Sequence, residues 1–479
     1  MIMMKWIWTS ILTYSILFHV DAQTLETSIN ELIQQASRRS QDIGISIRDV
    51  SSDQEIYQLN SDHFFIPASS LKLITTFSAL DILGKNFTYD TEVYLTGKIL
   101  TDGTLEGNIV INGNGDPSLG SDRFPGFPHI DDLDRKITEA IFKSGVRCID
   151  GEIIMVGAQS DSEGILPGWP WNDVGNYYGA GAYNINYREN YYTLKLDRSK
   201  GINSHSSVAG IHPEVPDMSV ESHITIDGPK TGDQAYIYGG DNTDHKIIRG
   251  TIPAGAGSFN IKGAMSRPWQ VWASRLKQML SKNHNIECQG IHYTTEWDIK
   301  GDRILSIKSP KLVDLVRKAN EKSINLYCEA FLKGISQKSA RDESLKKLYA
   351  NLRNHTLDTT EIIMVDGSGL SSRNVLTPRF FTKFLNHYYR TWGDEFTKSL
   401  IPRASHQGTV RRLLKGRPSE GKAWLKSGYI EKVLSYTGII RCKSGKSYSI
   451  TIISNHHREK PAVIRKLVED ILDTVYLEG

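Results

Sequence analysis

The sequence has little of several features that would assign it to a particular class of protein. Its four cysteines, Cys148, Cys288, Cys328 and Cys442, lie far apart and form no CxxC pair, which excludes zinc-site spacing and a dithiol redox motif. Lys and Arg number 57 against 54 Asp and Glu, a formal net charge of +3. No excess of one sign therefore favours nucleic acid or an anionic membrane surface as a partner. We found no internal repeat.

Long apolar runs are also missing beyond the first residues, so no later segment is expected to span a membrane. The first 22 residues have the layout of a signal peptide, with Lys5 ahead of an apolar run from Trp6 to Val20 and the small residue Ala22 behind it. This run is shorter than the roughly 20 residues that a membrane span needs. We expect cleavage after Ala22 and export to the periplasm. A retained anchor is the alternative, and it would bring peripheral contact with a membrane.

What is present is typical of a folded globular protein, with 39% hydrophobic and 23% charged residues. A length of 479 residues favours two or three domains. Nothing selects a cysteine pairing, although Cys328 lies in an apolar helical run and is expected in the core.

Hydrophobic periodicity divides the chain into three parts. Residues 24–39 have helical spacing, and residues 44–52 and 54–60 alternate like two antiparallel strands. Residues 91–307 are Gly-rich and mainly β in pattern, with helices expected near 131–144 and 268–282. Helical periodicity then returns, followed by three strand-like runs within 422–455 and a last amphipathic helix. We interpret residues 23–90 and 308–479 as one α/β domain, and residues 91–307 as an insertion of two β-rich subdomains.

The stretch PASSLKLITT, residues 67–76, places Ser69 three residues before Lys72 at the start of an apolar helical pattern. A serine hydroxyl needs a base within hydrogen-bond reach to become a nucleophile. Residues i and i+3 of a helix lie about 5–6 Å apart at Cβ, so the amine could reach the hydroxyl. The SxxK pattern is weak alone, because Ser344/Lys347 and Ser419/Lys422 repeat it.

Two further motifs follow in order along the chain. Ser323-Ile324-Asn325 matches SxN, and Lys426-Ser427-Gly428, in a strand pattern, matches K-[ST]-G. SxxK, SxN and K-[ST]-G together are the set found in penicillin-binding proteins and β-lactamases. We therefore predict a catalytic set of Ser69, Lys72, Ser323, Asn325 and Lys426.

Each of these groups has a chemical use. Ser323 can relay a proton to the leaving group, and the Asn325 amide can hold the substrate backbone. Lys426 and Ser427 can bind a carboxylate terminus, and Gly428 allows a substrate strand to lie close to the chain. The backbone N–H groups of Tyr429 and Ser69 could form an oxyanion hole.

With these motifs, the sequence resembles the class C low-molecular-mass penicillin-binding proteins, serine D-alanyl-D-alanine carboxypeptidases and endopeptidases of the penicillin-binding protein 4 type. Further matches are GNGDPSL (113–119), GWPWNDVGNYYGA (168–180) and VDGSGLSSRNVLTP (365–378), and 251 positions separate Lys72 from Ser323. The resemblance spans nearly the whole chain after residue 22. It implies an α/β transpeptidase-like domain, with an antiparallel sheet flanked by helices, and mainly β inserted domains.

The resemblance also implies a chemistry. A peptide ending in D-Ala-D-Ala would acylate Ser69, and cross-links ending in D-Ala-diaminopimelate would be cut in the same way. Trp169, Asp173 and Tyr177 resemble the family's group for the diaminopimelate side chain, with Asn172 as an alternative to Asp173. The resemblance implies that an arginine also binds this side chain; its position is Ser372 here, so Arg373, one residue later, is the arginine that we expect to take that role. Ser427 stands where the family usually has Thr, and a hydroxyl remains.

Peptidoglycan peptides and β-lactam antibiotics are the partners that we expect. A Ser–Lys site carries its own base, so we expect no metal and no organic cofactor. The turn GNGDP is expected to close a hairpin. A β-lactamase or esterase on the same domain, and a non-catalytic wall-binding relative, remain the alternative functions.

Overall fold

The structure, a computed structural model, describes residues 25–35, 42–240, 243–296, 298, 300–336 and 341–479. These residues form two compact units. The first unit holds the described residues up to Ser78, together with Val316–Ser323 and Tyr349–Gly479. The second unit holds Ala79–Leu315 and Ile324–Leu348. The predicted signal peptide lies outside the described residues.

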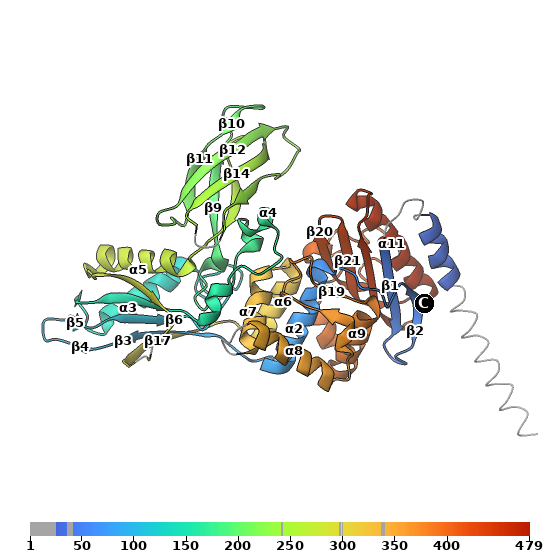
Figure 1. The fold of residues 1–479 in the computed structure, drawn as a ribbon, viewed down its shortest axis with the longest axis horizontal. Coiled ribbons are helices and arrows are strands. Elements are labelled where there is room, and N and C mark those ends of the chain that lie inside the picture. Colours follow the sequence, from blue (N-terminus) through green and yellow to red (C-terminus); the bar gives the residue numbers. More distant parts are fainter. Residues whose placement is uncertain (1–24, 36–41, 241–242, 297, 299, 337–340) are drawn as a thin grey trace, which may run out of the picture. The chain divides into compact units, whose positions relative to one another are not determined.

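A five-stranded antiparallel sheet forms the centre of the first unit (Figure 1). In order across the sheet, its strands are β2 (Glu55–Leu59), β1 (Asp42–Asp49), β22 (Ser447–Asn455), β21 (Val433–Arg441) and β20 (Ala423–Ile430). Strands from the two ends of the chain are therefore hydrogen-bonded neighbours, which Figure 1 shows as blue β1 in the same sheet as red β21. The strands predicted within 44–60 and 422–455 are confirmed.

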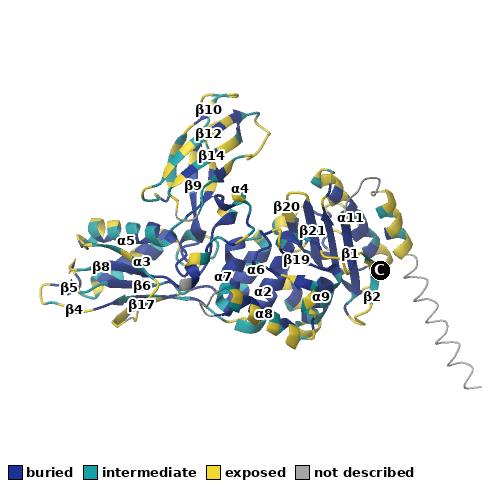
Figure 2. Cartoon of the chain, in the orientation of Figure 1, coloured by how far each residue is buried: buried dark blue, intermediate teal, exposed yellow. Residues whose placement is uncertain are grey.

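Helices cover both faces of this sheet. Residues 25–35 and α11 (Pro461–Glu478) join the inward-facing residues Ile45 and Ile47 of β1 in one hydrophobic cluster. Ser46 lies between these two and points to the other face, where its hydroxyl is 2.8 Å from that of Thr382 on α9 (Pro378–Trp392). Figure 2 shows β1 and β21 largely buried, as strands between two helical layers must be.

A helix from the N-terminal part of the first unit packs against α9. Phe77 of α2 (Lys72–Leu83) contacts the rings of Phe384 and Tyr388 on α9, with centroids 5.9 and 5.6 Å apart. The long helical pattern expected after residue 307 is broken at Ser323 and Ile324. The remaining elements of the C-terminal half are α6 (Leu312–Lys322), α7 (Asn325–Ile335), α8 (Arg341–Asn354), β18 (Ile362–Ile363), β19 (Val375–Leu376) and α10 (Asp394–Ser399).

The second unit consists mainly of four sheets. The largest has the order β16 (Gly290–Thr294), β8 (Glu152–Val156), β6 (Ile109–Asn112), β3 (Asp90–Leu95) and β17 (Asp302–Lys308). Two others are β10 (His205–Ser206), β12 (Ser219–Asp227), β14 (His245–Pro253) and β13 (Tyr236–Tyr238), and β11 (Val208–His212), β9 (Tyr191–Asp197) and β15 (Ser258–Ala264). The fourth is β4 (Lys98–Ile99), β5 (Thr104–Glu106) and β7 (Cys148–Ile149). Its helices include α3 (Ile130–Lys143), α4 (Trp171–Val174), α5 (Pro268–His284) and α7, and α3 and α5 confirm the two predicted helices.

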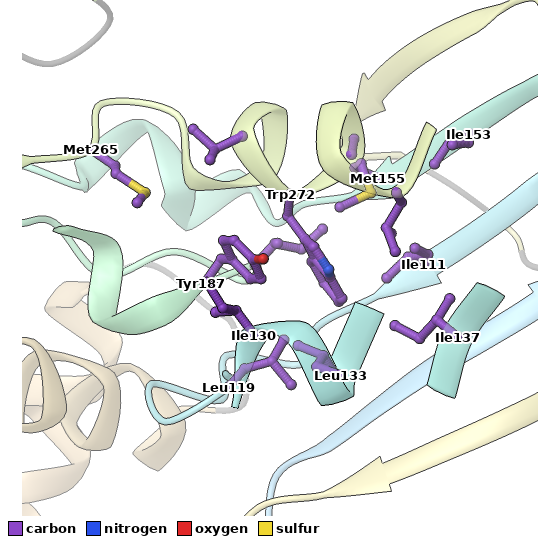
Figure 3. Packing of buried hydrophobic residues seen from close by; sticks show 14 of the residues in the cluster. Ile111, Leu119, Ile130, Leu133, Ile137, Ile153, Met155, Tyr187, Met265 and Trp272 are labelled. Atoms are coloured by element: carbon purple, nitrogen blue, oxygen red, sulfur yellow. The ribbon is translucent and has the colours of Figure 1, made fainter. Parts of the chain in front are cut away.

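A buried aromatic pair anchors the core of the second unit (Figure 3). The rings of Tyr187 and Trp272 stack with centroids 5.6 Å apart. Both donate to the buried carboxylate of Asp134, at 3.0 Å each, and Arg275 Nε donates to it at 2.8 Å. Burial raises the pKa of Asp134, and the contact with Arg275 opposes that rise. The satisfied carboxylate links α3 to α5.

Two expectations from the sequence need comment. The GNGDP segment does form a turn, in which Asp116 N donates to Gly113 O at 3.3 Å. It does not close a hairpin, because β6 just before it pairs with β3 and β8 instead; that part of the prediction was wrong. Cys328 is fully buried, as predicted, and none of the four cysteines is in a disulfide. Among the described residues, no helix is both long and apolar enough to cross a membrane.

Candidate active site

Ser69 lies on a short, strained turn. It belongs to a 3₁₀ turn, Ala68–Leu71, that leads directly into α2, whose first residue is Lys72. Ala68 has a φ of 48°, a left-handed conformation that costs a non-glycine residue about 1–2 kcal/mol. Such strain clusters at functional sites, where the surrounding fold holds it. The serine thus precedes the α-helix by one turn instead of beginning it.

The side chains of Ser69 and Lys72 are in contact. Lys72 Nζ lies 2.8 Å from Ser69 Oγ and donates to Ser368 O at 2.6 Å. Lys72 is fully buried, whereas Ser69 is half-buried. A buried amine must be satisfied by nearby polar groups, and one of those groups here is the hydroxyl of the predicted nucleophile. The Ser–Lys pair therefore has the geometry of a nucleophile and its base.

A second buried lysine contacts the serine of the SxN motif. Lys426, in the middle of β20, donates to Ser323 Oγ at 2.9 Å and to Ser427 O at 2.7 Å. It is fully buried. Ser323 has a φ of 58°, so this loop is also held in a strained conformation. The first unit thus brings together residues that are 103 positions apart in sequence.

Gly428 connects these two pairs. A Cβ on Gly428 would lie 2.4 Å from Pro67 O and 2.9 Å from Ser70 N. Strand β20 therefore lies directly against the turn that carries Ser69, and only glycine fits there. Its missing side chain makes room for this turn, whereas from sequence we expected a substrate strand to use that space. The strand that holds Lys426 is thereby positioned beside the nucleophile.

Ser427 contacts Thr409, a partner that we did not predict from sequence. Its hydroxyl lies 2.6 Å from that of Thr409, in the 3₁₀ turn Gly408–Val410. A Cβ on Gly408 would meet Glu321 O at 2.0 Å, so this turn packs closely on the end of α6. No sequence motif marks Thr409. Tyr429 is 58% exposed, and the predicted oxyanion hole involves only its backbone N–H group.

Asn325 belongs to the second unit, because the boundary between the units falls just after Ser323. It is the first residue of α7 and is largely buried, with 8% of its surface exposed. Its Nδ2 donates to Tyr178 O at 2.7 Å. The asparagine of the SxN motif is thus anchored by the segment that carries the predicted diaminopimelate group.

Within that group, Asp173 and Tyr177 are both near Tyr178. Tyr178 donates its hydroxyl to Asp173 Oδ1 at 3.1 Å, and its ring lies edge-on to that of Tyr177 at 5.3 Å. Burial raises the pKa of Asp173, and the hydrogen bond from Tyr178 opposes the rise. Tyr177 is half-exposed, whereas Trp169 is buried. Asn172, the alternative acid position, is exposed on α4.

Arg373 is exposed and lies in the first unit. Its backbone N–H donates to Ser371 Oγ at 3.2 Å. Asp173 lies in the second unit, so the two charges predicted to bind diaminopimelate come from different units. Ser372, at the family's arginine position, is exposed as well.

The two other SxxK matches form no Ser–Lys pair. Ser344 donates to Ser336 Oγ at 2.6 Å and Ser419 donates to Asp473, while Lys347 and Lys422 are exposed. Across the residues that the structure describes, no group of three His, Cys, Asp or Glu side chains could hold a metal ion. Ser69 and Lys72 are therefore set apart from the repeats by tertiary contacts.

Comparisons with known protein sequences identify D-Ala-D-Ala carboxypeptidases as relatives of this chain. The sequence model of the D-Ala-D-Ala carboxypeptidase 3 (S13) family matches residues 25–475. A D-alanyl-D-alanine carboxypeptidase of Actinomadura sp. (strain R39) is 23% identical over 465 residues, which cover 90% of this chain and 81% of that protein.

Solved structures extend the comparison to the fold. The structure of penicillin binding protein 4 from Haemophilus influenzae superposes with a TM-score of 0.80 at 20% identity, covering 94% of this chain and 99% of that one. A predatory peptidoglycan endopeptidase from Bdellovibrio bacteriovorus superposes at 0.52 with 13% identity, covering 91% and 93%. At these identities the structures show the fold alone. The predicted fold class, an α/β penicillin-binding-protein domain with β-rich inserted domains, is confirmed.

Proposed function

The chain belongs to the D-Ala-D-Ala carboxypeptidase 3 (S13) family and is a serine-type D-Ala-D-Ala carboxypeptidase, and we propose that Ser69 is its nucleophile and Lys72 the base. The observation that carries this assignment is the 2.8 Å contact between the buried Lys72 amine and the Ser69 hydroxyl. A base at that distance can accept the hydroxyl proton as the oxygen attacks.

Acylation then proceeds in two steps. Ser69 Oγ attacks the carbonyl carbon of the penultimate D-Ala, and its proton passes to Lys72 Nζ. The backbone N–H groups of Ser69 and Tyr429 stabilise the oxyanion of the tetrahedral intermediate. When the peptide C–N bond breaks, the terminal D-Ala amine leaves with a proton. Ser323 relays that proton, and its hydroxyl is held by Lys426 at 2.9 Å.

Residues of β20 bind the terminal carboxylate of the substrate. Lys426 supplies a positive charge and Ser427 a hydroxyl, beside a strand fixed against the nucleophile turn through Gly428. A free terminal carboxylate is what distinguishes a stem peptide from an internal segment. Asn325, held by Tyr178, would bind the peptide backbone.

Water completes the cycle by attacking the acyl-enzyme carbonyl, which releases the shortened peptide and returns the proton to Ser69. A β-lactam acylates the same hydroxyl, because its strained amide occupies the place of the D-Ala-D-Ala bond. With the ring opened, the leaving amine stays tethered to the acyl group. The resulting penicilloyl-enzyme is therefore expected to last for hours.

We extend the proposal to D-Ala-diaminopimelate cross-links, with Trp169, Asp173, Tyr177 and Arg373 binding the free end of the diaminopimelate side chain. The similarity in fold to a peptidoglycan endopeptidase supports this extension. Mass spectrometry of purified muropeptide dimers before and after incubation would report which bond is cut. Intact dimers with trimmed stems would reject the endopeptidase activity.

Export to the periplasm is part of the proposal, supported by the signal-peptide layout of residues 1–22. N-terminal sequencing of the protein recovered from the periplasm should begin just after Ala22. A chain that retains residues 1–22 and sediments with membranes would instead indicate an anchor.

The nucleophile is tested with Ser69→Ala. Fluorescent penicillin should label the wild-type chain covalently and leave the variant unlabelled. A matched control is Ser70→Ala, since Ser70 donates to Pro67 O at 2.8 Å and faces the core beside the proposed nucleophile. Labelling that persisted in Ser69→Ala would reject Ser69. Rapid turnover of the penicillin by the wild type would favour a β-lactamase, and unlabelled wild type a non-catalytic relative.

A further inference from the structure

Two successive carbonyls of the DGSGL loop, residues 366–370, face one side of α2. Ser368 O accepts from Lys72 Nζ at 2.6 Å, and Gly367 O accepts from Thr75 Oγ1 at 2.7 Å. Lys72 and Thr75 are three residues apart, so they share a helix face. From sequence, this segment was a match to the family and the place of its arginine position. In the structure, its backbone is a partner of the lysine that serves as the base.

The loop is held by the side chain of Asp366, which is fully buried. Asp366 Oδ1 accepts from Gly369 N at 2.7 Å and from Asn374 Nδ2 at 2.8 Å, while Oδ2 accepts from Ser371 N at 2.7 Å. Both carboxylate oxygens are thus needed, since the donors come from two sides. Hydrogen bonds of a buried carboxylate are among the stronger ones in proteins. The carbonyls at 367 and 368 lie between the anchored positions.

The same loop touches the turn that carries the nucleophile. Gly369 has a φ of 77°, and a Cβ there would lie 2.0 Å from Ala68 O. The loop backbone therefore approaches within contact distance of the residue just before Ser69, and a side chain at 369 would push it away. Asp366 holds the loop in this position by accepting a hydrogen bond from Gly369 N.

A neutral amine has two N–H bonds and one lone pair, whereas an ammonium has three N–H bonds. To act as a base, Lys72 must direct its lone pair at Ser69 Oγ. The Ser368 carbonyl accepts one N–H bond in both protonation states, which limits rotation about the Cε–Nζ bond. A carbonyl that is fixed in place therefore pre-orients the lone pair.

We propose that Asp366 is a positioning residue of the active site: its carboxylate fixes the Ser368 carbonyl, and that carbonyl aims the Lys72 amine at Ser69. This inference rests on the proposed function, in which Ser69 and Lys72 carry out acylation. Asp366 itself contacts neither the substrate nor the reacting atoms. Its loss should slow acylation without weakening the binding of the β-lactam that precedes it.

The test is Asp366→Asn, which keeps the size of the side chain but has one acceptor oxygen for donors on two sides. Saturation kinetics with fluorescent penicillin separate the acylation rate constant, k2, from the dissociation constant of the preceding complex, K. We expect k2 to fall about tenfold to hundredfold, the range that misplaced catalytic groups produce, with K unchanged and full labelling at the end. The control is Asp358→Asn, an exposed carboxylate of the same unit that caps Thr360 N at 3.0 Å; both constants should be those of the wild type.

Several results would overturn the inference. Wild-type k2 in Asp366→Asn would do so, and so would a lower labelled fraction with unchanged k2, because that pattern reports misfolding alone. A weaker K with unchanged k2 would assign the loop to binding. Failure of the proposed function gives a different result, in which the wild-type chain carries no label on Ser69.

A second variant keeps the test open if Asp366→Asn does not fold. Thr75→Val removes the hydroxyl that holds Gly367 O and puts a methyl group of similar shape in its place. It should lower k2 at unchanged K. Wild-type k2 in a folded Thr75→Val chain would overturn the inference by itself.

Discussion

The buried amine of Lys426 donates to the hydroxyl of Ser323 at 2.9 Å across 103 positions of sequence. This contact connects the strand that is proposed to bind the substrate carboxylate with the serine that is proposed to relay the proton. Ser323→Ala should therefore remove the relay and also leave a buried cation with one acceptor fewer. We expect the release of D-Ala from diacetyl-Lys-D-Ala-D-Ala to fall by about 10²–10⁴-fold, the usual contribution of general acid–base catalysis.

The matched control is Ser444→Ala, an exposed serine in the turn between β21 and β22. It should release D-Ala at the wild-type rate. Wild-type activity in Ser323→Ala would remove Ser323 from the catalytic set.

Lys72→Arg separates the charge of this residue from its role as a base. Arginine keeps a cation and can still donate toward Ser368 O, but it cannot be deprotonated in a protein. The rate of acylation by penicillin should fall by about 10²–10⁴-fold. Acylation at the wild-type rate would mean that Lys72 acts only through its positive charge, and that another group takes the proton.

Thr409→Val tests whether the hydroxyl pair Thr409–Ser427 belongs to the carboxylate site. The two oxygens lie 2.6 Å apart, so Thr409 orients the Ser427 hydroxyl. We expect KM to rise for peptides with a free terminal carboxylate and to stay unchanged for the same peptides with an amidated terminus. An equal rise for both would point to a general distortion of β20.

Gly428→Ala tests the close approach of β20 to the nucleophile turn. The new Cβ would lie 2.4 Å from Pro67 O, and overpacking of this kind costs about 1–3 kcal/mol. Both the melting temperature and the rate of penicillin labelling should fall. Gly210→Ala is the comparison, because its Cβ would have 3.9 Å to the nearest atom and the backbone there is not left-handed. Equal effects of the two substitutions would contradict the packing argument.

Asp116, in the GNGDP turn, should make stability depend on pH. Burial raises its pKa from 3.8 to about 6. The folded state therefore binds the proton more tightly than the unfolded state, and the resulting stability is present below about pH 4 and lost as the pH rises through about 6. Its full size is about 3 kcal/mol.

Asp116→Asn should remove this dependence, because an amide does not titrate. Its oxygen can still accept from Ser118 N, which lies 2.8 Å from Asp116 Oδ1 in the wild type. Urea unfolding at several pH values measures it. The variant should be no less stable than the wild type at pH 7, and its unfolding free energy should change less between pH 4 and 6. A curve parallel to that of the wild type would show that Asp116 is not the group responsible.

Local sequence was enough to predict much of this protein. The i, i+3 spacing of Ser69 and Lys72 puts both on one side of a helical turn, and strand alternation predicted β20 with Lys426 in its middle. These are properties of a few neighbouring residues, and the period of the backbone determines them. The order of the three motifs then indicated a family, and the comparisons with known proteins agree with that indication.

Other features depend on residues that meet only after folding. Asp366 and Tyr178 lie in stretches that match the family, but their roles cannot be read from those stretches, and no motif marks Thr409; each acts through a partner that is distant in sequence or through a backbone carbonyl. Likewise, we expected Gly428 to make room for substrate. The turn that occupies this space belongs to residues 67–70, which are far from Gly428 in sequence. The amino-acid order therefore determined which chemical groups are available, while tertiary packing decided which of them touch. Contacts between distant segments are set by the summed packing of the whole unit, which no short window of sequence contains.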